Sequence, residues 1–425
     1  MAKIEVHNLY KIFGPRPQEV LPQVQAEVPK DEIWAKTGHT VGLDNISLSV
    51  EQGETFVVMG LSGSGKSTFV RCVNRLIEAT AGEILIDGSP VLELSDREIK
   101  QLRREKLGMV FQRFALFPHR SVIRNVAYGL RVQGVAREER LQRAQHWIDV
   151  VGLSGYEQVR PRQLSGGMQQ RVGLARALCT DPEVLLMDEA FSALDPLIRR
   201  EMQDELIRLQ QELHKTIIFI THDLDEALRL GDRIAILKDG RLVQIGTPIE
   251  IITRPADYYV EAFVRDVNRA RVLTAKVVMD REITPIPVST SPQEALQGMR
   301  RLNQYLGYVV DRDRKYLGVV LAEQVAAASK VGDPNLAGTL IADTPTTTPD
   351  EVLTDLLAVS AASTLPIAVV DEQGVFLGAL PKAIILRALA SEQEILRALT
   401  SEQEGEELHS AKAAAWEAEA GEDWD

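Results

Sequence analysis

The chain has 425 residues, of which 45% are hydrophobic and 26% are charged, and its formal net charge is -13 at pH 7. This length predicts about three domains, and the composition is ordinary for a globular protein. The acidic balance disfavours nonspecific binding to nucleic acid or anionic lipid, so no nucleic-acid partner is expected. With only Cys72 and Cys179 present, no apolar signal-peptide core and no bilayer-length apolar stretch, a reducing cytoplasmic compartment is expected.

The most specific motif is a phosphate-binding loop, because residues 60–67 match G-x-x-x-x-G-K-[ST]. A strand-like run, 55–59, precedes the loop, and a helix is predicted from Thr68 to Leu76. Glycines allow successive N–H groups to face one anion, and the helix N-terminus adds its positive dipole end. Lys66 is expected to reach the β- and γ-phosphates, and Ser67 to ligate Mg²⁺. The predicted nucleotide-binding residues of this segment are Gly60, Leu61, Ser62, Gly63, Ser64, Gly65, Lys66, Ser67 and Thr68.

Two further apolar runs end in polar residues suited to phosphate chemistry. Residues 184–187 lead into Asp188 and Glu189, and residues 216–221 lead into His222. Asp188 suits a water-mediated contact with Mg²⁺ beside Ser67, and Glu189 suits orienting and partly deprotonating an attacking water. His222 is expected on the neighbouring strand end, within reach of a γ-phosphate. The alternatives are an N-capping acid pair and a structural histidine.

A second anion site is predicted at residues 164–171, where Ser165, Gly166 and Gly167 open a helical stretch from Met168 to Leu178. A single ATP needs only one such helix start. The simplest use of the second is to cover the nucleotide of another subunit.

Together these motifs resemble the ATPase subunit of an ABC transporter over residues 1–265. Residues 164–170 are similar to the LSGGQ signature, with Met168 in place of the usual Gln. Gln112 matches the Q-loop, and the D-loop is matched by residues 192–195, which end at Asp195. Phe13 corresponds to the adenine-stacking aromatic residue of the family, with Tyr10 as the runner-up.

The resemblance implies an α/β P-loop NTPase that forms a head-to-tail homodimer with two ATP molecules and Mg²⁺. It implies Glu189, His222 and Lys66 as catalytic residues, and Ser67, Gln112 and Asp188 as residues of the metal site. It also implies transmembrane permease subunits as partners, an indirect role for a solute-binding protein or domain, and a peripheral location on the cytoplasmic face of the inner membrane. The apolar residues near Gln112 either line the permease groove or belong to the core; they are Phe114, Leu116 and Phe117.

Within the family, residues 9–14 and 187–199 resemble the glycine betaine/proline importers, as do the Met168 variant and the insertion Pro15–His39. The expected function is therefore ATP hydrolysis for an osmoprotectant importer. One alternative is the ATPase of another ABC importer. A soluble ABC ATPase of repair or translation is disfavoured, because only residues 68–163 separate the phosphate loop from the signature and the chain has one such loop. A non-transport nucleotide sensor would not need intact Glu189 and His222.

Residues 281–388 contain a weak internal repeat, in which the sequence of residues 291–296 resembles that of 348–353 and the sequence of 309–318 resembles that of 369–378. Each copy predicts a helix, a strand, a turn and a strand, and the pair resembles a tandem CBS module. The residues after the final strands lack the Ser/Thr and Asp of adenosine-binding CBS domains. Ionic-strength sensing, cyclic-dinucleotide binding and a purely dimerising role stay open. The predicted domains are an ATPase domain, 1–265, a linker, 266–280, CBS repeats, 281–340 and 341–390, and a tail, 391–425.

The tail is strongly acidic, with nine acidic residues and one basic residue, Lys412, between Glu402 and Asp425. It also carries a ten-residue duplication, because residues 385–394 recur almost unchanged as 395–404. The Ala/Glu bias and the charge predict a solvated, partly disordered segment. An acidic tail beyond a module that carries exposed bases also suggests a switch that responds to salt.

Overall fold

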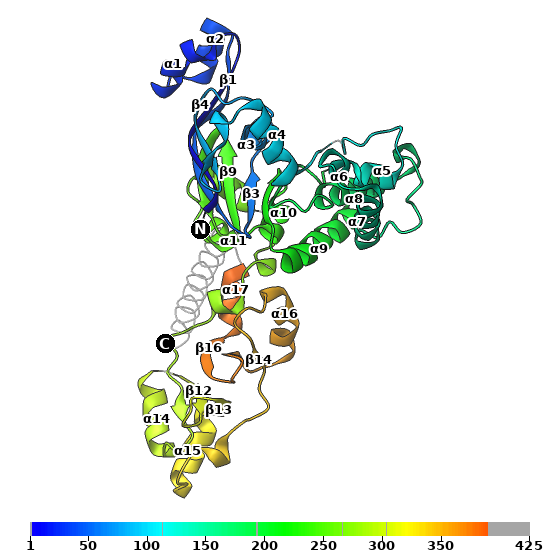
Figure 1. Cartoon of the computed structure of the whole chain (residues 1–425). Coiled ribbons are helices and arrows are strands. Elements are labelled where there is room, and N and C mark those ends of the chain that lie inside the picture. Colours follow the sequence, from blue (N-terminus) through cyan, green and yellow to red (C-terminus); the bar gives the residue numbers. More distant parts are fainter. Residues whose placement is uncertain (1, 113, 193, 266, 303, 390–425) are drawn as a thin grey trace, which may run out of the picture. The chain divides into compact units, whose positions relative to one another are not determined.

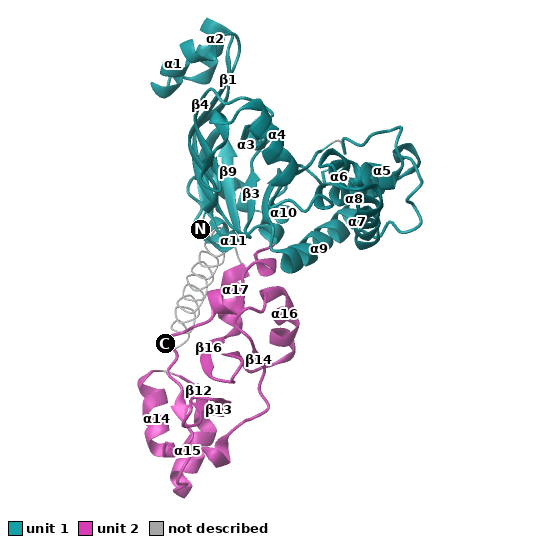
Figure 2. Cartoon of the chain, in the orientation of Figure 1, with its two compact units in different colours: residues 1–267 teal, residues 268–425 magenta. Residues whose placement is uncertain are grey.

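The computed structural model describes the chain except residues 1, 113, 193, 266, 303 and 390–425 (Figure 1). It divides into two compact units, Met1–Val267 and Asn268–Asp425 (Figure 2). Among the described residues, no helix is long and apolar enough to cross a bilayer. The predicted acidic tail and most of its duplication lie outside the described residues.

The first unit is organised around a six-stranded sheet in the order β10-β9-β3-β8-β7-β6. All its strands are parallel except β10. Their carboxyl ends therefore meet at one edge, which brings distant motifs together. The predicted strands at 55–59, 184–188 and 216–221 are confirmed, and all their residues are buried. The six strands are β3 Thr55–Met59, β6 Leu107–Val110, β7 Val184–Asp188, β8 Thr216–Thr221, β9 Arg233–Lys238 and β10 Arg241–Gly246.

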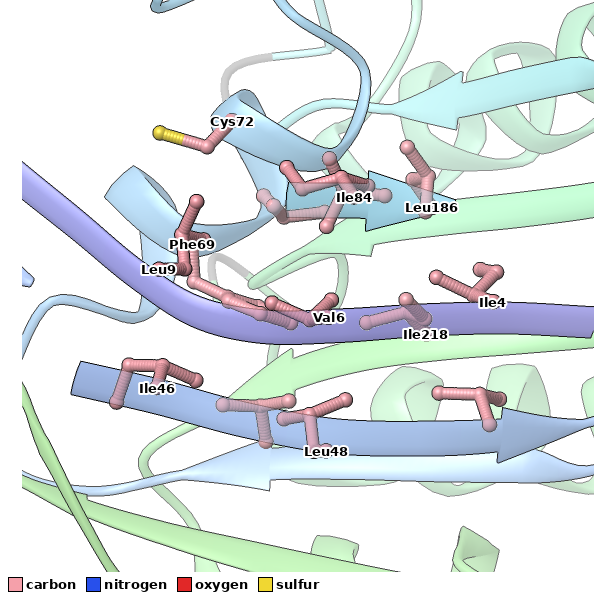
Figure 3. Close-up of a cluster of buried hydrophobic side chains, with 14 of the residues drawn as sticks. Ile4, Val6, Leu9, Ile46, Leu48, Phe69, Cys72, Ile84, Leu186 and Ile218 are labelled. Carbon is pink, nitrogen blue, oxygen red and sulfur yellow. The ribbon is translucent and has the colours of Figure 1, made fainter. Parts of the chain in front are cut away.

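A second, antiparallel sheet of order β2-β1-β4-β5 packs beside the first through a shared apolar core. Its strands are β1 Ala2–Phe13, β2 Thr40–Glu51, β4 Ala81–Ile86 and β5 Ser89–Pro90. Figure 3 shows Val6 and Ile46 from this sheet, Ile218 from β8, and Phe69 from helix α3 (Lys66–Val73). The helix after the phosphate loop is thus fixed between both sheets.

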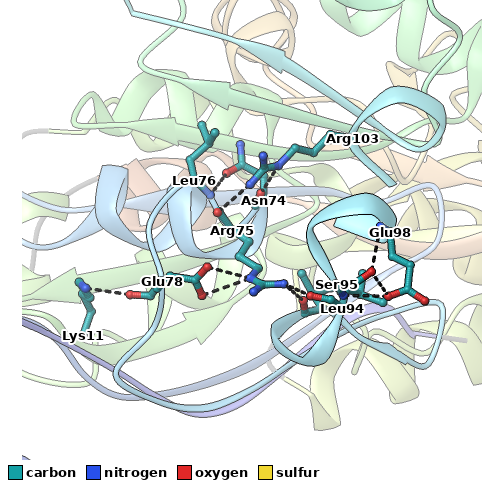
Figure 4. Close-up of polar contacts among 10 residues, drawn as sticks. Lys11, Asn74, Arg75, Leu76, Glu78, Leu94, Ser95, Glu98 and Arg103 are labelled. Carbon is teal, nitrogen blue, oxygen red and sulfur yellow. Dashed lines mark hydrogen bonds and ion pairs between the residues drawn. The ribbon is translucent and has the colours of Figure 1, made fainter. Parts of the chain in front are cut away.

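Polar contacts hold the far end of α3 (Figure 4). Arg103 of helix α4 (Asp96–Glu105) donates to the carbonyl oxygen of Asn74 at 2.9 Å, just beyond the end of α3. Arg75 pairs with Glu78 at 2.9 Å. The helix that opens at the phosphate loop is therefore anchored at both ends.

The predicted insertion Pro15–His39 folds as η1 (Pro17–Glu19), α1 (Leu21–Gln25) and α2 (Lys30–Thr37). It has a small core of its own, in which its apolar side chains pack against β1 and the start of β2. The buried members of that core are Tyr10, Ile12, Val20, Val24, Ile33 and Val41. The insertion is therefore a folded element attached to the ends of β1 and β2.

A helical region carries the predicted second anion site. Its core joins α5, α7 and α8 and includes Val126, Ile148, Leu164 and Val172. The remaining helices of the first unit are α5 Val122–Val126, α6 Tyr128–Val132, α7 Arg137–Val150, α8 Gly166–Leu178, α9 Pro196–Leu213, α10 Leu224–Leu230, α11 Pro248–Thr253 and α12 Tyr258–Val264.

The second unit contains two three-stranded sheets with the same topology, β11-β12-β13 and β14-β15-β16. In each sheet the first pair of strands is parallel and the second is antiparallel. The predicted repeat of helix, strand, turn and strand is confirmed. The elements are β11 Ile286–Pro287, α14 Pro292–Arg301, β12 Leu306–Val310, β13 Tyr316–Leu321, α15 Ala322–Val331, β14 Thr346–Thr347, α16 Leu353–Ala362, β15 Ile367–Val370, β16 Phe376–Leu380 and α17 Lys382–Leu389.

The described part of the predicted linker, 266–280, is not a free connection. It forms η4 (Arg269–Arg271) and α13 (Ala275–Val278), and Ala270, Leu273 and Ala275 are buried with residues of the second repeat. The N–H of Ala275 donates to the carbonyl oxygen of Glu351 at 2.9 Å. Residues 349–352 pair with this segment, and α16 begins after them, at Leu353.

Candidate active site

The phosphate loop connects β3 to α3 and can be built only from glycine at two positions. A Cβ on Gly60 would lie 2.2 Å from the carbonyl oxygen of Leu237, and one on Gly65 would lie 2.6 Å from that of Gly42. Both glycines have positive φ angles, of 150° and 100°. The helix starts at Lys66, two residues earlier than predicted, so the amino-terminal N–H groups of α3 belong to the loop itself.

Lys66 is 4% exposed and curls back over the loop. Its Nζ donates to the carbonyl oxygens of Gly60 at 2.8 Å and Leu61 at 2.9 Å. Burial lowers the pKa of the ammonium, while Glu189 and Asp188 oppose that shift. Among the described residues, no carboxylate pairs directly with Lys66. A buried cation held only by carbonyl groups suits an anion in the loop.

Ser67 and Asp188 meet at the same edge. The Ser67 hydroxyl donates to Oδ1 of Asp188 at 2.7 Å, and the guanidinium of Arg71 donates to Oδ2 at 3.2 Å. Asp188 is only 1% exposed, so these two donors satisfy a carboxylate that would be costly to bury alone. Arg71 was not predicted, although its position four residues after Ser67 on α3 places both on one helix face.

Glu189 follows Asp188 with a left-handed φ of 46°, and its N–H donates to the carbonyl oxygen of Ile220 at 3.1 Å. One carboxylate oxygen accepts a hydrogen bond of 2.7 Å from Nε2 of Gln112. The other lies 3.8 Å from Nδ1 of His222. Three predicted site residues therefore converge from the loops that follow β6, β7 and β8. Strained backbone of this kind is common at functional sites.

A residue that the sequence did not indicate holds the Gln112 loop. Phe114 and Ala115 both have left-handed backbone, with φ of 53° and 47°. Arg176 of α8 donates to the carbonyl oxygen of Ala115 at 2.7 Å and to that of Phe114 at 3.1 Å. Burial lowers the pKa of its guanidinium. Helical periodicity alone cannot reveal a partner that is a distant backbone carbonyl.

The apolar residues after Gln112 are half-buried. Leu116 packs against the helical core, and the ring of Phe117 lies 4.5 Å from that of Tyr128 and under the guanidinium of Arg120. These contacts favour a core role for Leu116 and Phe117, which was one of the two predicted alternatives.

The second predicted anion site lies at the start of α8. Ser165 caps the helix, because its Oγ accepts from the N–H of Met168 at 3.3 Å. Asp195 caps α9 by accepting from the N–H groups of Leu197 and Ile198, each at 3.1 Å. In the described chain, no hydrogen bond or ion pair connects the helix start at 165–167 or Asp195 with residues 60–67. The two helix starts thus do not form one contact network within a single subunit.

The two candidate adenine-stacking residues, Phe13 and Tyr10, differ in how far their side chains are exposed. Phe13 is 39% exposed and its ring covers Gly42, since a Cβ on that glycine would lie 2.6 Å from Cε2 of Phe13. Tyr10 is 8% exposed and belongs to the core of the insertion. The greater exposure of Phe13 favours it over Tyr10 as the adenine-stacking residue.

The predicted Mg²⁺ site can be compared with the oxygen ligands that the nearby side chains offer. No three His, Cys, Asp or Glu side chains in the described residues form a metal site. Ser67 and Asp188 offer two hard oxygen ligands, which fit Mg²⁺ only when phosphate oxygens or waters complete the shell. Gln112, the third predicted ligand, contacts Glu189 in this structure.

Comparison with known proteins agrees with this geometry. Residues 43–192 match the family described as ABC transporter, and residues 275–330 match the CBS domain. The chain is 49% identical to the glycine betaine transport ATP-binding protein OpuAA of Bacillus subtilis (strain 168), over 92% of this chain and 93% of that protein. It is 48% identical to the glycine betaine/carnitine transport ATP-binding protein GbuA of Listeria monocytogenes, over 92% and 99% of the two chains. The dimeric structure of MJ0796, a bacterial ABC transporter cassette, aligns with a TM-score of 0.50 and 33% identity, over 58% of this chain and 98% of that one.

Proposed function

Because this chain belongs to the ATP-binding subunits of ABC transporters, we propose that it powers the import of glycine betaine or a closely related osmoprotectant. As a member of this family it binds and hydrolyses ATP. The observation that carries the proposal is the convergence of Lys66, Asp188, Glu189 and His222 at one edge of the parallel sheet. The choice of solute rests on the relatives, whose names specify glycine betaine.

ATP would lie across the phosphate loop and the exposed ring of Phe13. The N–H groups at the start of α3 would donate to its phosphates, and Lys66 would exchange its carbonyl partners for the stronger charge of the β- and γ-phosphates. The Phe13 ring, which packs against Gly42, would stack on adenine.

Mg²⁺ would be held by Ser67 and Asp188, with Gln112 as a third ligand. When bound, the ion would supply positive charge that stabilises the negative charge developing on the phosphate oxygens. Arg71 would keep the Asp188 carboxylate oriented, because it holds the Oδ2 atom that Ser67 does not use.

Glu189 would orient and partly deprotonate the attacking water. Gln112 holds one of its carboxylate oxygens, which fixes the plane of the carboxylate and leaves the second oxygen beside His222. The His222 side chain is more than half exposed, so it is free to contact a γ-phosphate. A positioned base of this kind contributes roughly 10²–10⁴-fold to rate.

The ATP site would be completed by a second copy of the chain. Ser165 caps α8, which begins with Gly166 and Gly167, and among the described residues these three make no hydrogen bond or ion pair with the phosphate loop of their own subunit. A head-to-tail homodimer would place them, with Asp195, over the nucleotide of the partner. The dimer would dock on permease subunits at the cytoplasmic face of the membrane, and the permease would receive solute from a binding protein or domain.

The second unit would regulate this activity as a tandem CBS module. Its two sheets have the same topology, although the CBS match covers residues 275–330 only. Ionic strength or a cyclic dinucleotide would be the signal, and dimerisation without a signal is the remaining alternative.

Reconstitution tests the proposal. The chain and its permease subunits, placed in vesicles with the solute-binding component, are expected to accumulate radiolabelled glycine betaine only when ATP and Mg²⁺ are inside. A Glu189→Gln complex is the matched negative control. ATP-dependent uptake of an unrelated solute, with none of any quaternary amine, would contradict the substrate assignment.

A further inference from the structure

Helix α2 of the insertion places a lysine beside the nucleotide site. Lys30 is the first residue of α2, yet its Nζ donates to the carbonyl oxygen of Asp239, which lies 209 residues away in the turn between β9 and β10. It also lies 3.5 Å from the carbonyl oxygen of Val41. The ammonium therefore joins the insertion, the start of β2 and a distant turn.

The turn that Lys30 holds supports the phosphate loop directly. The N–H of Gly240 donates to the carbonyl oxygen of Ser64 at 3.0 Å, and the carbonyl of Gly240 accepts from the N–H of Asp44 at 2.8 Å. A Cβ on Gly240 would lie 2.6 Å from the carbonyl oxygen of Gly42 and 3.0 Å from Nζ of Lys30. Residues 239–240 are thus wedged between Lys30 and the phosphate loop.

Gly42 is the point where these elements meet. The ring of Phe13 covers it, and its carbonyl oxygen would contact a Cβ on Gly65 and one on Gly240, at 2.6 Å in each case. The predicted adenine platform, the phosphate loop and the turn are therefore in contact through one residue. A substitution of Lys30 is therefore expected to affect the positions of all three elements.

The charges around Lys30 only partly offset the cost of burying its ammonium group. Burial lowers the pKa of Lys30, whereas Asp44 and Asp239 raise it and Arg241 opposes them. Asp44 is already paired with Arg241 at 2.6 Å. The groups that the Lys30 ammonium contacts directly are consequently backbone carbonyl oxygens.

We propose that Lys30 is a positioning residue for ATP: it presses the turn at 239–240 against the phosphate loop, so that the insertion raises the affinity for nucleotide. This inference rests on the proposed function of the site. Lys30 is expected to affect the affinity for ATP and not the rate of hydrolysis, because bound phosphates would themselves hold the loop in place once ATP is present.

The test is the Lys30→Met variant of the full chain. A fluorescent ATP analogue is titrated to obtain Kd, and steady-state hydrolysis gives KM and kcat. Loss of a charge-assisted hydrogen bond is expected to raise Kd and KM about tenfold. The value of kcat at saturating ATP is expected to stay within about twofold, as for loss of uniform binding.

Two variants serve as controls. Lys30→Arg keeps the cation and is expected to restore most of the affinity. Lys36→Met removes an exposed lysine of the same helix, whose partner is Glu32, and is expected to leave Kd unchanged. Thermal melting of each variant separates loss of fold from loss of affinity.

An unchanged Kd in Lys30→Met would overturn the inference, as would equal effects of Lys30→Met and Lys36→Met. A lowered Tm with reduced kcat and unchanged KM would assign Lys30 a structural role only, which also overturns it. A wild-type chain that binds no nucleotide would instead refute the proposed function.

Discussion

Gln112 and Glu189 are joined by a hydrogen bond of 2.7 Å, although 77 residues separate them in the chain. The bond connects the loop that follows β6 with the carboxylate that follows β7. Any movement of the Gln112 loop therefore changes the orientation of the proposed catalytic base. Arg176 holds that loop from α8, the helix that Ser165 caps, so hydrogen bonds connect the proposed catalytic base with the helix of the predicted second anion site.

Replacing Glu189 by Gln preserves size and hydrogen bonding but removes the base. ATP is expected to bind normally, while phosphate release falls by about a hundredfold or more, the usual scale for losing a positioned base. The control is Glu212→Gln, an exposed residue near the end of α9. Hydrolysis near the wild-type rate in Glu189→Gln would refute the assignment.

The two-subunit site is tested by mixing inactive subunits. Lys66→Ala damages the phosphate loop, and Ser165→Arg blocks the start of α8. A mixed dimer then has one site with both lesions and one with neither, so part of the ATPase activity should return. If each subunit used its own Ser165, no site would be intact and no activity would return. Nucleotide occupancy is measured in parallel, because cooperativity between sites can conceal the rescue.

Arg176→Met is expected to release the strained backbone at Phe114 and Ala115 and so to displace Gln112 from Glu189. Because misplacement of a catalytic group is costly, kcat should fall by about tenfold to a hundredfold while Kd for ATP is retained. Arg176→Lys should recover part of the loss, since one donor remains. Arg143→Met, which removes an exposed partner of Glu139, should have no effect on kcat. An unchanged kcat in Arg176→Met would show that the loop does not depend on this arginine.

The acidic tail predicts a response to salt. Bases in the second unit could hold the tail in an inhibited arrangement; they are Arg300, Arg301, Arg312, Arg314 and Lys315. Such attraction weakens as the Debye length shrinks from about 10 Å at 0.1 M to about 3 Å at 1 M. The reconstituted complex is therefore expected to activate as KCl rises. Deleting the chain from Gly405 should move the midpoint to lower salt.

An unchanged midpoint after this deletion would exclude the tail as the element that sets it. Removal of residues 281–425 with no change would exclude the whole module. The control is the same titration of Lys66→Ala, which should stay inactive at every salt concentration.

The chemistry of the ATP site could be predicted from the sequence because each motif is local. The loop 60–67 specifies its own backbone, and Asp188, Glu189 and His222 each follow an apolar run that reads as a parallel strand. Parallel strands bring their carboxyl ends to one edge, so convergence could be expected without coordinates. The packing of residues 266–280 could not be predicted in this way, because their apolar side chains pack against the second repeat, which lies about 80 residues or more further along the chain.

The sequence by itself therefore indicated the candidate residues for the reaction, and the tertiary structure alone decided which residues hold them in place. Phe13 and Tyr10 are both aromatic residues of β1, and only the packing of the insertion buries one and exposes the other. Lys30 and Arg176 look like ordinary helix-surface cations until their partners are known. Those partners are backbone carbonyls, which every residue has, so no side-chain pattern marks them and only the folded chain selects which of them a cation reaches.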